Sequence, residues 1–198
     1  MLRAKIQKLD AILLTHEHND HIIGIDDVRP FNFMQLQDMP VFATTRVQAE
    51  LRKRFAYIFQ EKNRYPGAPM LTLRDIHRDQ DFMINDIPIV PIEVMHGRLP
   101  VLGFRIGDFA YITDMKSIEP KEFKKLKGLS HLVINALHHK EHHSHLNLEE
   151  ATAFAKKVGA DQTYFTHISH RMGLHVEIDP QLPAGIGLAY DGLKVQCR

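Results

Sequence analysis

The chain has 198 residues, of which 44% are hydrophobic, and its 25 Lys and Arg against 24 Asp and Glu give a formal net charge of +1. This length and composition predict one globular domain over residues 1–198. The charge balance favours neither a long nucleic acid nor a membrane as partner, and no apolar run approaches the ~20 residues of a membrane helix. The single cysteine, Cys197, excludes an intrachain disulfide and fits a reducing, cytoplasmic setting. Histidine is the outlier, with 14 residues.

Strands and helices are predicted to alternate along the chain, which indicates an α/β layered domain. The predicted strands are 9–15, 39–44, two within 81–96 with a turn at Asn85-Asp86, a hairpin over 101–114 turning at Gly107-Asp108, 130–137, 162–167, and a closing pair within 185–197. The predicted helices are a short one from Asn19 to near Pro30, then 44–63, 119–129 and 147–160.

The stretch "THEHNDH" (15–21) follows the first predicted strand directly. His16 and His18 are two positions apart, so both side chains can point to the same side of an extended turn. Asp20 and His21 follow at the start of a helix and can serve a second ion. Imidazole and carboxylate groups together suit zinc, manganese or iron.

Three further strands are predicted to end in a metal-competent side chain, namely His96, Asp114 and His167. In α/β folds, strand ends and the loops after them carry the chemistry. One ion would take His16, His18 and a distant histidine, and the other Asp20, His21 and another distant histidine, with one carboxylate bridging the two. Two ions about 3.5–4 Å apart would hold a hydroxide between them.

In this arrangement "THEHNDH" resembles the HxHxDH signature of the metallo-β-lactamase superfamily. "VMHG" with His96, "YITD" with Asp114 and "FTHISH" with His167 follow in the order typical of that superfamily. The resemblance implies an αββα sandwich that binds two divalent ions, zinc or manganese, with iron as a further choice. The implied metal ligands are His16, His18, Asp20, His21, His96, Asp114 and His167.

The later motifs are most similar to the phosphodiesterase branch, in particular to phosphoribosyl cyclic phosphodiesterases of the PhnP type. "HSHLNLEEA" places His145 where that branch has a histidine that contacts the scissile phosphate. Members normally open with strands that precede the HxHxDH strand. We therefore expect this chain to lack the first strands of one sheet, and to associate with further copies through the exposed sheet edge.

These features predict a metal-dependent hydrolase of a small, cyclic phosphodiester. A metal-bridging hydroxide would attack, Asp20 would orient it or relay a proton, and His145 would donate to a phosphoryl or leaving oxygen. Two alternatives stay open: a thioesterase or lactonase on the same fold, and an inactive, truncated metal-binding module.

Overall fold

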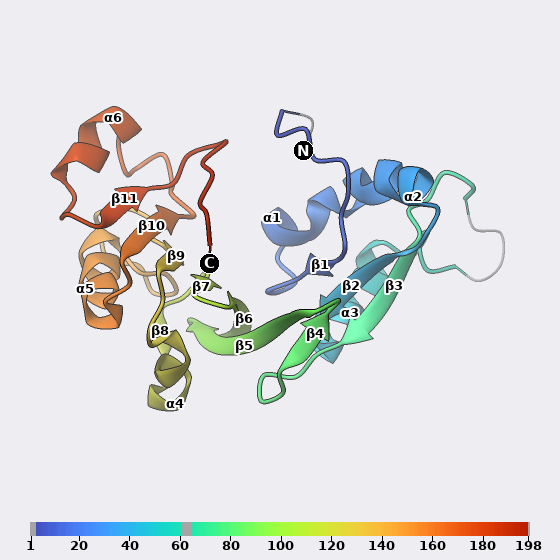
Figure 1. The fold of residues 1–198 in the computed structure, drawn as a ribbon, viewed down its shortest axis with the longest axis horizontal. Helices are drawn as coiled ribbons and strands as arrows, with labels where there is room; N and C mark the ends of the chain where they lie inside the picture. Colours follow the sequence, from blue (N-terminus) through green and yellow to red (C-terminus); the bar gives the residue numbers. More distant parts are fainter. Residues whose placement is uncertain (1–2, 61–64, 198) are drawn as a thin grey trace. The chain divides into compact units, whose positions relative to one another are not determined.

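The computed structural model describes residues 3–60 and 65–197 (Figure 1). The chain forms two compact units, residues 1–86 and 87–198. Both units contain strands and helices, as the sequence predicts, although no helix lies within the described residues 71–118. That the two units make up a single domain stays a prediction.

The first unit is built on a three-stranded parallel sheet in the order β1-β2-β3. Its elements are β1 (Ile12–Leu13), α1 (Asn19–Ile22), the 3-10 helix η1 (Ile23–Val28), α2 (Arg29–Gln35), β2 (Met39–Ala43), α3 (Thr45–Arg54), β3 (Leu71–Asp75) and β4 (Phe82–Ile84). Alternate residues of β2 are buried, and Val41 packs with Val47 and Leu51 of α3 in the core of this unit. Burial of these apolar side chains holds the helix on the sheet.

Two helix boundaries in the first unit differ from the prediction. Pro30 does not end a helix but lies in the first turn of α2, where its missing N–H costs no helical hydrogen bond. The helix predicted over 44–63 begins as expected, with the Thr44 side chain accepting from the Val47 N–H, but α3 ends at Arg54. Residues 55–59 form turns, Gln60 lies outside any element, and residues 61–63 lie outside the described part of the chain.

The second unit contains a mixed sheet in the order β11-β10-β9-β7-β6-β5, with the short β8 paired to β5. Its elements are β5 (Ile87–His96), β6 (Leu99–Ile106), β7 (Phe109–Tyr111), β8 (Ser117–Ile118), α4 (Pro120–Phe123), the 3-10 helix η2 (Lys124–Leu126), β9 (His131–Asn135), α5 (Leu148–Val158), β10 (Gln162–Thr166), α6 (His175–Ile178), the 3-10 helix η3 (Asp179–Gln181) and β11 (Ile186–Leu188). The predicted hairpin is present as β6 and β7, and Gly107 takes the left-handed conformation at its turn.

The parallel strands of this sheet fix where its chemistry can lie. β7, β9, β10 and β11 are mutually parallel along the sheet, so their carboxyl ends share one edge. Fully buried side chains, among them Leu132, Ile134 and Phe165, anchor β9 and β10 in the core. The loops that leave this edge therefore start from a rigid base.

The closing hairpin predicted within 185–197 is absent from the described residues. Only β11 forms, and it pairs in parallel with β10. A turn follows, in which the Leu193 N–H donates to the Tyr190 carbonyl and Gly192 has a φ of 95°. The chain therefore leaves the sheet where a second strand would begin.

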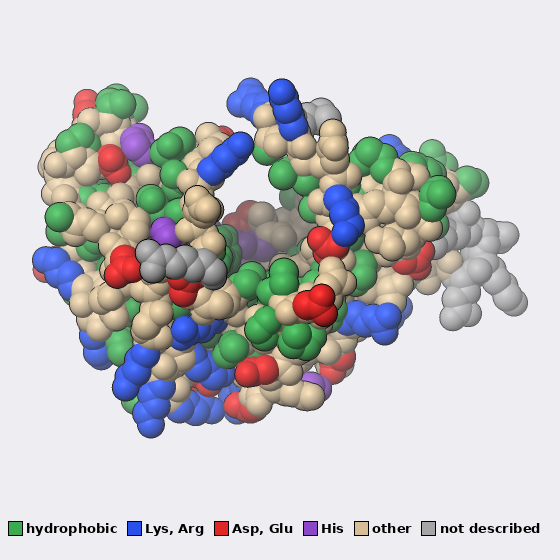
Figure 2. Space-filling model, in the orientation of Figure 1, with side chains coloured by type: hydrophobic (Ala, Val, Ile, Leu, Met, Phe, Trp, Pro, Cys, Tyr) green, Lys and Arg blue, Asp and Glu red, His purple; other side chains and the backbone are tan. Residues whose placement is uncertain are grey.

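Lysine side chains gather on the surface over α4 and η2, as Figure 2 shows on the lower left. Lys121, Lys124 and Lys127 are exposed, so this lysine-rich segment presents a solvated face. Among the described residues, no helix combines the length and apolar character needed to cross a membrane.

Candidate metal centre

The first unit brings together the four predicted ligands of the opening motif. His16 follows β1 and is fully buried, and its Nε2 lies 3.0 Å from Nδ1 of His18. The rings of His16 and His21 are 4.2 Å apart, and His21 Nε2 lies 3.2 Å from Asp20 Oδ2. Three imidazoles and a carboxylate from residues 16–21 thus lie close together.

The intervening residues of the motif, Glu17 and Asn19, are held by arginines of α3. Arg54 donates to the Glu17 carbonyl at 2.8 Å and to Asn19 Oδ1 at 2.7 Å, and Arg46 pairs with the Glu17 carboxylate at 3.2 Å. These contacts hold the Glu17 and Asn19 side chains against α3 and so set the path of the loop after β1. The spacing of the motif gives no sign of them, because the arginines lie about thirty residues further along the chain.

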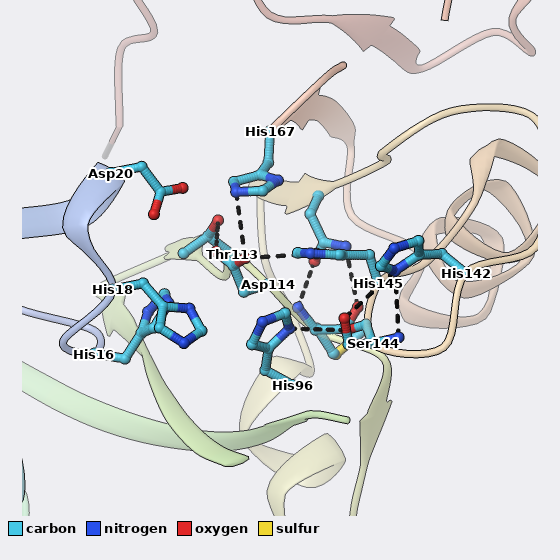
Figure 3. Close-up of polar contacts among 12 residues, drawn as sticks. His16, His18, Asp20, His96, Thr113, Asp114, His142, Ser144, His145 and His167 are labelled. Carbon is cyan, nitrogen blue, oxygen red and sulfur yellow. Dashed lines mark hydrogen bonds and ion pairs between the residues drawn. The ribbon is translucent and has the colours of Figure 1, made fainter. Parts of the chain in front are cut away.

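The second unit brings together the other four predicted residues (Figure 3). His96 ends β5, Asp114 follows β7, His145 lies in the loop before α5, and His167 follows β10. Asp114 Oδ1 lies 3.2 Å from His167 Nε2 and 3.5 Å from His145 Nδ1. The His145 ring is 4.5 Å from that of His96 and 4.9 Å from that of His167.

Two of these residues have a left-handed backbone. Asp114 has a φ of 57° and His167 a φ of 54°. Such a conformation costs a non-glycine residue about 1–3 kcal/mol and is maintained only where the surroundings dictate it. His167 comes directly after β10 and Asp114 three residues after β7, and the two side chains meet, with 3.2 Å between His167 Nε2 and Asp114 Oδ1.

Sequence reasoning missed two buried residues that fix Asp114. The Thr113 hydroxyl donates to Asp114 Oδ2 at 2.8 Å. Fully buried Asn135 accepts from the Met115 N–H at 2.7 Å and donates to the Met115 carbonyl at 3.0 Å. Asn135 is the one strongly polar side chain in the otherwise apolar run "LVINAL". A polar residue in a buried strand is the sequence feature that points to a role for Asn135.

Burial sets the protonation of His145. Burial lowers the pKa of His145 to about 4; the Asp114 carboxylate opposes this shift, while His96, His167 and His142 add to it. His145 is therefore a neutral imidazole at neutral pH and can donate one N–H. Its neighbour His96 donates from Nδ1 to the Ser144 carbonyl at 3.0 Å, so Nδ1 carries a proton.

The donor atoms in both units suit a divalent transition metal. Two nitrogens bound to one tetrahedral zinc would lie about 3.3 Å apart, close to the separation of His16 Nε2 and His18 Nδ1. In the second unit one donor atom each from His96, Asp114 and His145 falls within 4.8 Å of the others. The ligand roles of all seven predicted residues, and the catalytic roles of Asp20 and His145, stay predictions.

Three comparisons place the chain among known proteins. A family model described as "Beta-lactamase superfamily domain" matches residues 1–168. The crystal structure of a diphosphatase from the PhnP family superposes with a TM-score of 0.89 at 39% identity, over 98% of this chain and 73% of that one. Zinc-bound PqqB from Methylobacterium extorquens superposes with a TM-score of 0.72 at 14% identity, over 94% of this chain and 73% of that one, which shows a shared fold.

The curated octanoyltransferase of Porphyromonas gingivalis is 42% identical over 194 residues. The match takes in 98% of this chain but only 39% of that protein, so the chain spans about two fifths of the length of its curated relative. The name therefore describes a much longer protein.

The chain belongs to the metallo-β-lactamase superfamily, and the predicted α/β fold class is confirmed. Within this superfamily the chain belongs to the PhnP family. The resemblance seen in the sequence is therefore confirmed at the level of both superfamily and branch.

Proposed function

We propose that the protein is a phosphohydrolase that uses two divalent ions, zinc or manganese, to cleave a phosphodiester or diphosphate bond in a small molecule. The observation that carries this proposal is the convergence of His96, Asp114, His145 and His167 at strand ends and in the loop before α5, in a member of the PhnP family. The similarity to a diphosphatase widens the substrate class from the cyclic phosphodiesters expected from the sequence to diphosphates.

The proposed ligands form two sets. His16 and His18 would hold one ion and Asp20 and His21 the other, while His96, His167 and Asp114 would supply the remaining ligands. When bound, such ions lower the pKa of water so that hydroxide is available near neutral pH. The His96 Nδ1–H bond to Ser144 supports this assignment, because it presents Nε2 as the ligand atom.

His145 acts on the leaving side of the proposed reaction. Hydroxide oxygen would bond to phosphorus, the bond from phosphorus to the leaving oxygen would break, and that oxygen would take a proton from water, while the N–H of His145 donates a hydrogen bond and keeps its proton. An N–H donor beside the phosphoryl group stabilises the charge that develops as the bond breaks. A neutral imidazole suits this role at pH 7, since it donates without having first to be protonated.

The proposal is tested by assaying metal-loaded protein on bis(p-nitrophenyl) phosphate, a diphosphate diester, a lactone and a thioester. We expect turnover of the phosphorus compounds, and His145→Ala should lower kcat by about 10²–10³. Turnover of the lactone or thioester alone would select the carbon-centre alternative. Full metal occupancy without turnover of any compound would favour the inactive module.

The proposed partners follow from the same chemistry. The balanced charge favours a small substrate over a long nucleic acid or a membrane. We also propose self-association through a sheet edge, because β1 lies at an edge of its sheet with only two residues paired. Sedimentation at micromolar concentration should then show a dimer or larger species, and a monomer would refute it.

A further inference from the structure

The peptide groups of Ser144 fix opposite tautomers in two histidines. Its carbonyl accepts from His96 Nδ1, as described above. Its N–H donates to His142 Nδ1 at 3.3 Å, and its hydroxyl lies 3.4 Å from the same nitrogen. A backbone N–H can only donate, so His142 Nδ1 is an acceptor and the proton of the neutral ring sits on Nε2.

His142 therefore presents a pre-set N–H donor beside the candidate centre. Its ring lies 5.0 Å from that of His145, and His145 has Asp114 on one side and His142 on the other (Figure 3). The predicted function assigns no task to His142. The side chain is half-buried, so a bound molecule can reach it.

A second buried histidine adjoins this donor. His138 is 6% exposed, its ring lies 6.0 Å from that of His142, and its Nδ1 has no hydrogen-bond partner among the described residues. Buried polar atoms are almost always paired. An unpaired one next to a half-buried donor indicates a place where a polar ligand completes the hydrogen bonding.

We propose that His142 donates from Nε2 to an oxygen of the phosphoryl group that is not attacked, and so makes the protein prefer diphosphates to compounds with one phosphate. The inference rests on the proposed function in taking a phosphate compound as the ligand. Neighbouring phosphoryl groups share one oxygen, so a diphosphate held at His145 brings its second group to the adjacent ring. A single phosphate has no group to place there.

Calorimetric binding of imidodiphosphate, which resists hydrolysis, and of orthophosphate to metal-loaded protein tests this inference. We expect wild type to bind imidodiphosphate more tightly than orthophosphate. His142→Ala should weaken imidodiphosphate about tenfold, the effect of one hydrogen bond to a charged group, and orthophosphate by less than about twofold. His142→Gln carries an amide N–H near the position of Nε2 and should restore part of the affinity.

His143→Ala is the matched control. His143 is an exposed neighbour whose ring lies 4.4 Å from that of His142, and its removal should leave both affinities unchanged. Equal weakening of both anions by His142→Ala, no weakening of either, or no preference in wild type would overturn the inference. Tight imidodiphosphate binding that depends on His142, without turnover of any phosphate compound, would refute the proposed function and leave the inference standing.

Discussion

Asn135 shows how a residue outside the ligand set can decide where a ligand lies. The oxygen and the nitrogen of its side chain both hydrogen-bond to the backbone of Met115, the residue after Asp114. This bracket holds the chain at the point where Asp114 takes its strained φ of 57°. Fixing the backbone there fixes the direction of the carboxylate.

Asn135→Ala should lower both stability and metal content. The change leaves the Met115 N–H and carbonyl without their buried partner, which should reduce the free energy of unfolding by about 2–4 kcal/mol. It also frees Asp114 from its imposed position, so metal bound per chain should fall. Urea denaturation and elemental analysis measure the two effects.

Asn85→Ala serves as the control for this prediction, because the one side-chain hydrogen bond of Asn85 within the described residues is to exposed Asp10, at 3.2 Å. It should leave metal content unchanged. Full metal occupancy in Asn135→Ala would show that Asp114 keeps its direction without the bracket.

At the residue scale, the sequence predicts the candidate ligands but not the residues that aim them. Spacing of the ligand types in "THEHNDH" and their places at strand ends are local patterns. The contacts of Asn135 with Met115 and of Arg54 with Asn19 span 20 and 35 residues, and no local pattern encodes them. Such partners become visible only when the chain is folded.

Helix α5 combines a capping box with an ion pair. The Asn147 side chain accepts from the Glu150 N–H at 2.8 Å, and the Glu150 carboxylate accepts from the Asn147 N–H at 2.9 Å. Glu150 also receives Lys116 Nζ at 2.7 Å. Burial alone would raise the pKa of Glu150, but the bonds from Lys116 and Asn147 lower it overall.

Glu150→Gln should therefore destabilise the protein in a pH-dependent way. The glutamine oxygen can still accept from Asn147, so the loss is that of the ion pair, about 0.5–1 kcal/mol at pH 7 for partly exposed groups. Because the pKa is lowered on folding, the carboxylate's contribution is complete above the ordinary value of 4.5 and disappears as pH falls through the folded-state value.

Chemical denaturation between pH 7 and pH 3 measures this effect. The difference between wild type and Glu150→Gln should shrink towards zero at the acid end. Exposed Glu149 offers a matched control in the same helical turn, and Glu149→Gln should cost less at pH 7. A difference for Glu150→Gln that stays constant with pH would contradict the assigned ion pair.

The two predicted long helices differ in outcome because their ends are encoded differently. Residues 147–160 contain a complete set of local signals, from Asn147 with Glu150 at the start to Gly159 in the left-handed conformation at the end. Residues 44–63 have a capping threonine but no glycine or proline before position 66, so periodicity suggested a longer helix than α3. Its end after Arg54 comes with an arginine that is bonded to the histidine-rich loop.

At the scale of the whole molecule, the predicted ligands are divided between residues 1–86 and 87–198. A metal ion that binds the folded chain and not the unfolded one stabilises the folded state. By mass action, metal at 100 times its Kd would add about 2.7 kcal/mol per ion. Metal binding should therefore raise the free energy of unfolding.

Thermal denaturation with and without metal measures this stabilisation. Adding zinc or manganese to chelator-treated protein should raise Tm by about 5–10 °C per ion in a chain of this size. Elemental analysis should give about two ions per chain.

His16→Ala should abolish most of the rise in Tm and lower the metal content. His77→Ala is the control, because this exposed histidine forms an ion pair with Asp75 outside the predicted ligand set. An unchanged Tm in the presence of metal would argue against a centre that depends on the folded chain.

The Ser144 peptide has a consequence for mutational surveys of this protein. Exchanging the residue for alanine removes only a hydroxyl and keeps the N–H and carbonyl that sort the protons of His142 and His96. An alanine scan would thus record position 144 as dispensable. Gly97 lies against this peptide. Its φ is +61°, and a Cβ at position 97 would lie 3.3 Å from the Cβ of Ser144. A side chain at position 97 would displace the Ser144 peptide. The effect of disturbing residue 144 would therefore appear in a substitution of a glycine 47 positions away in the sequence.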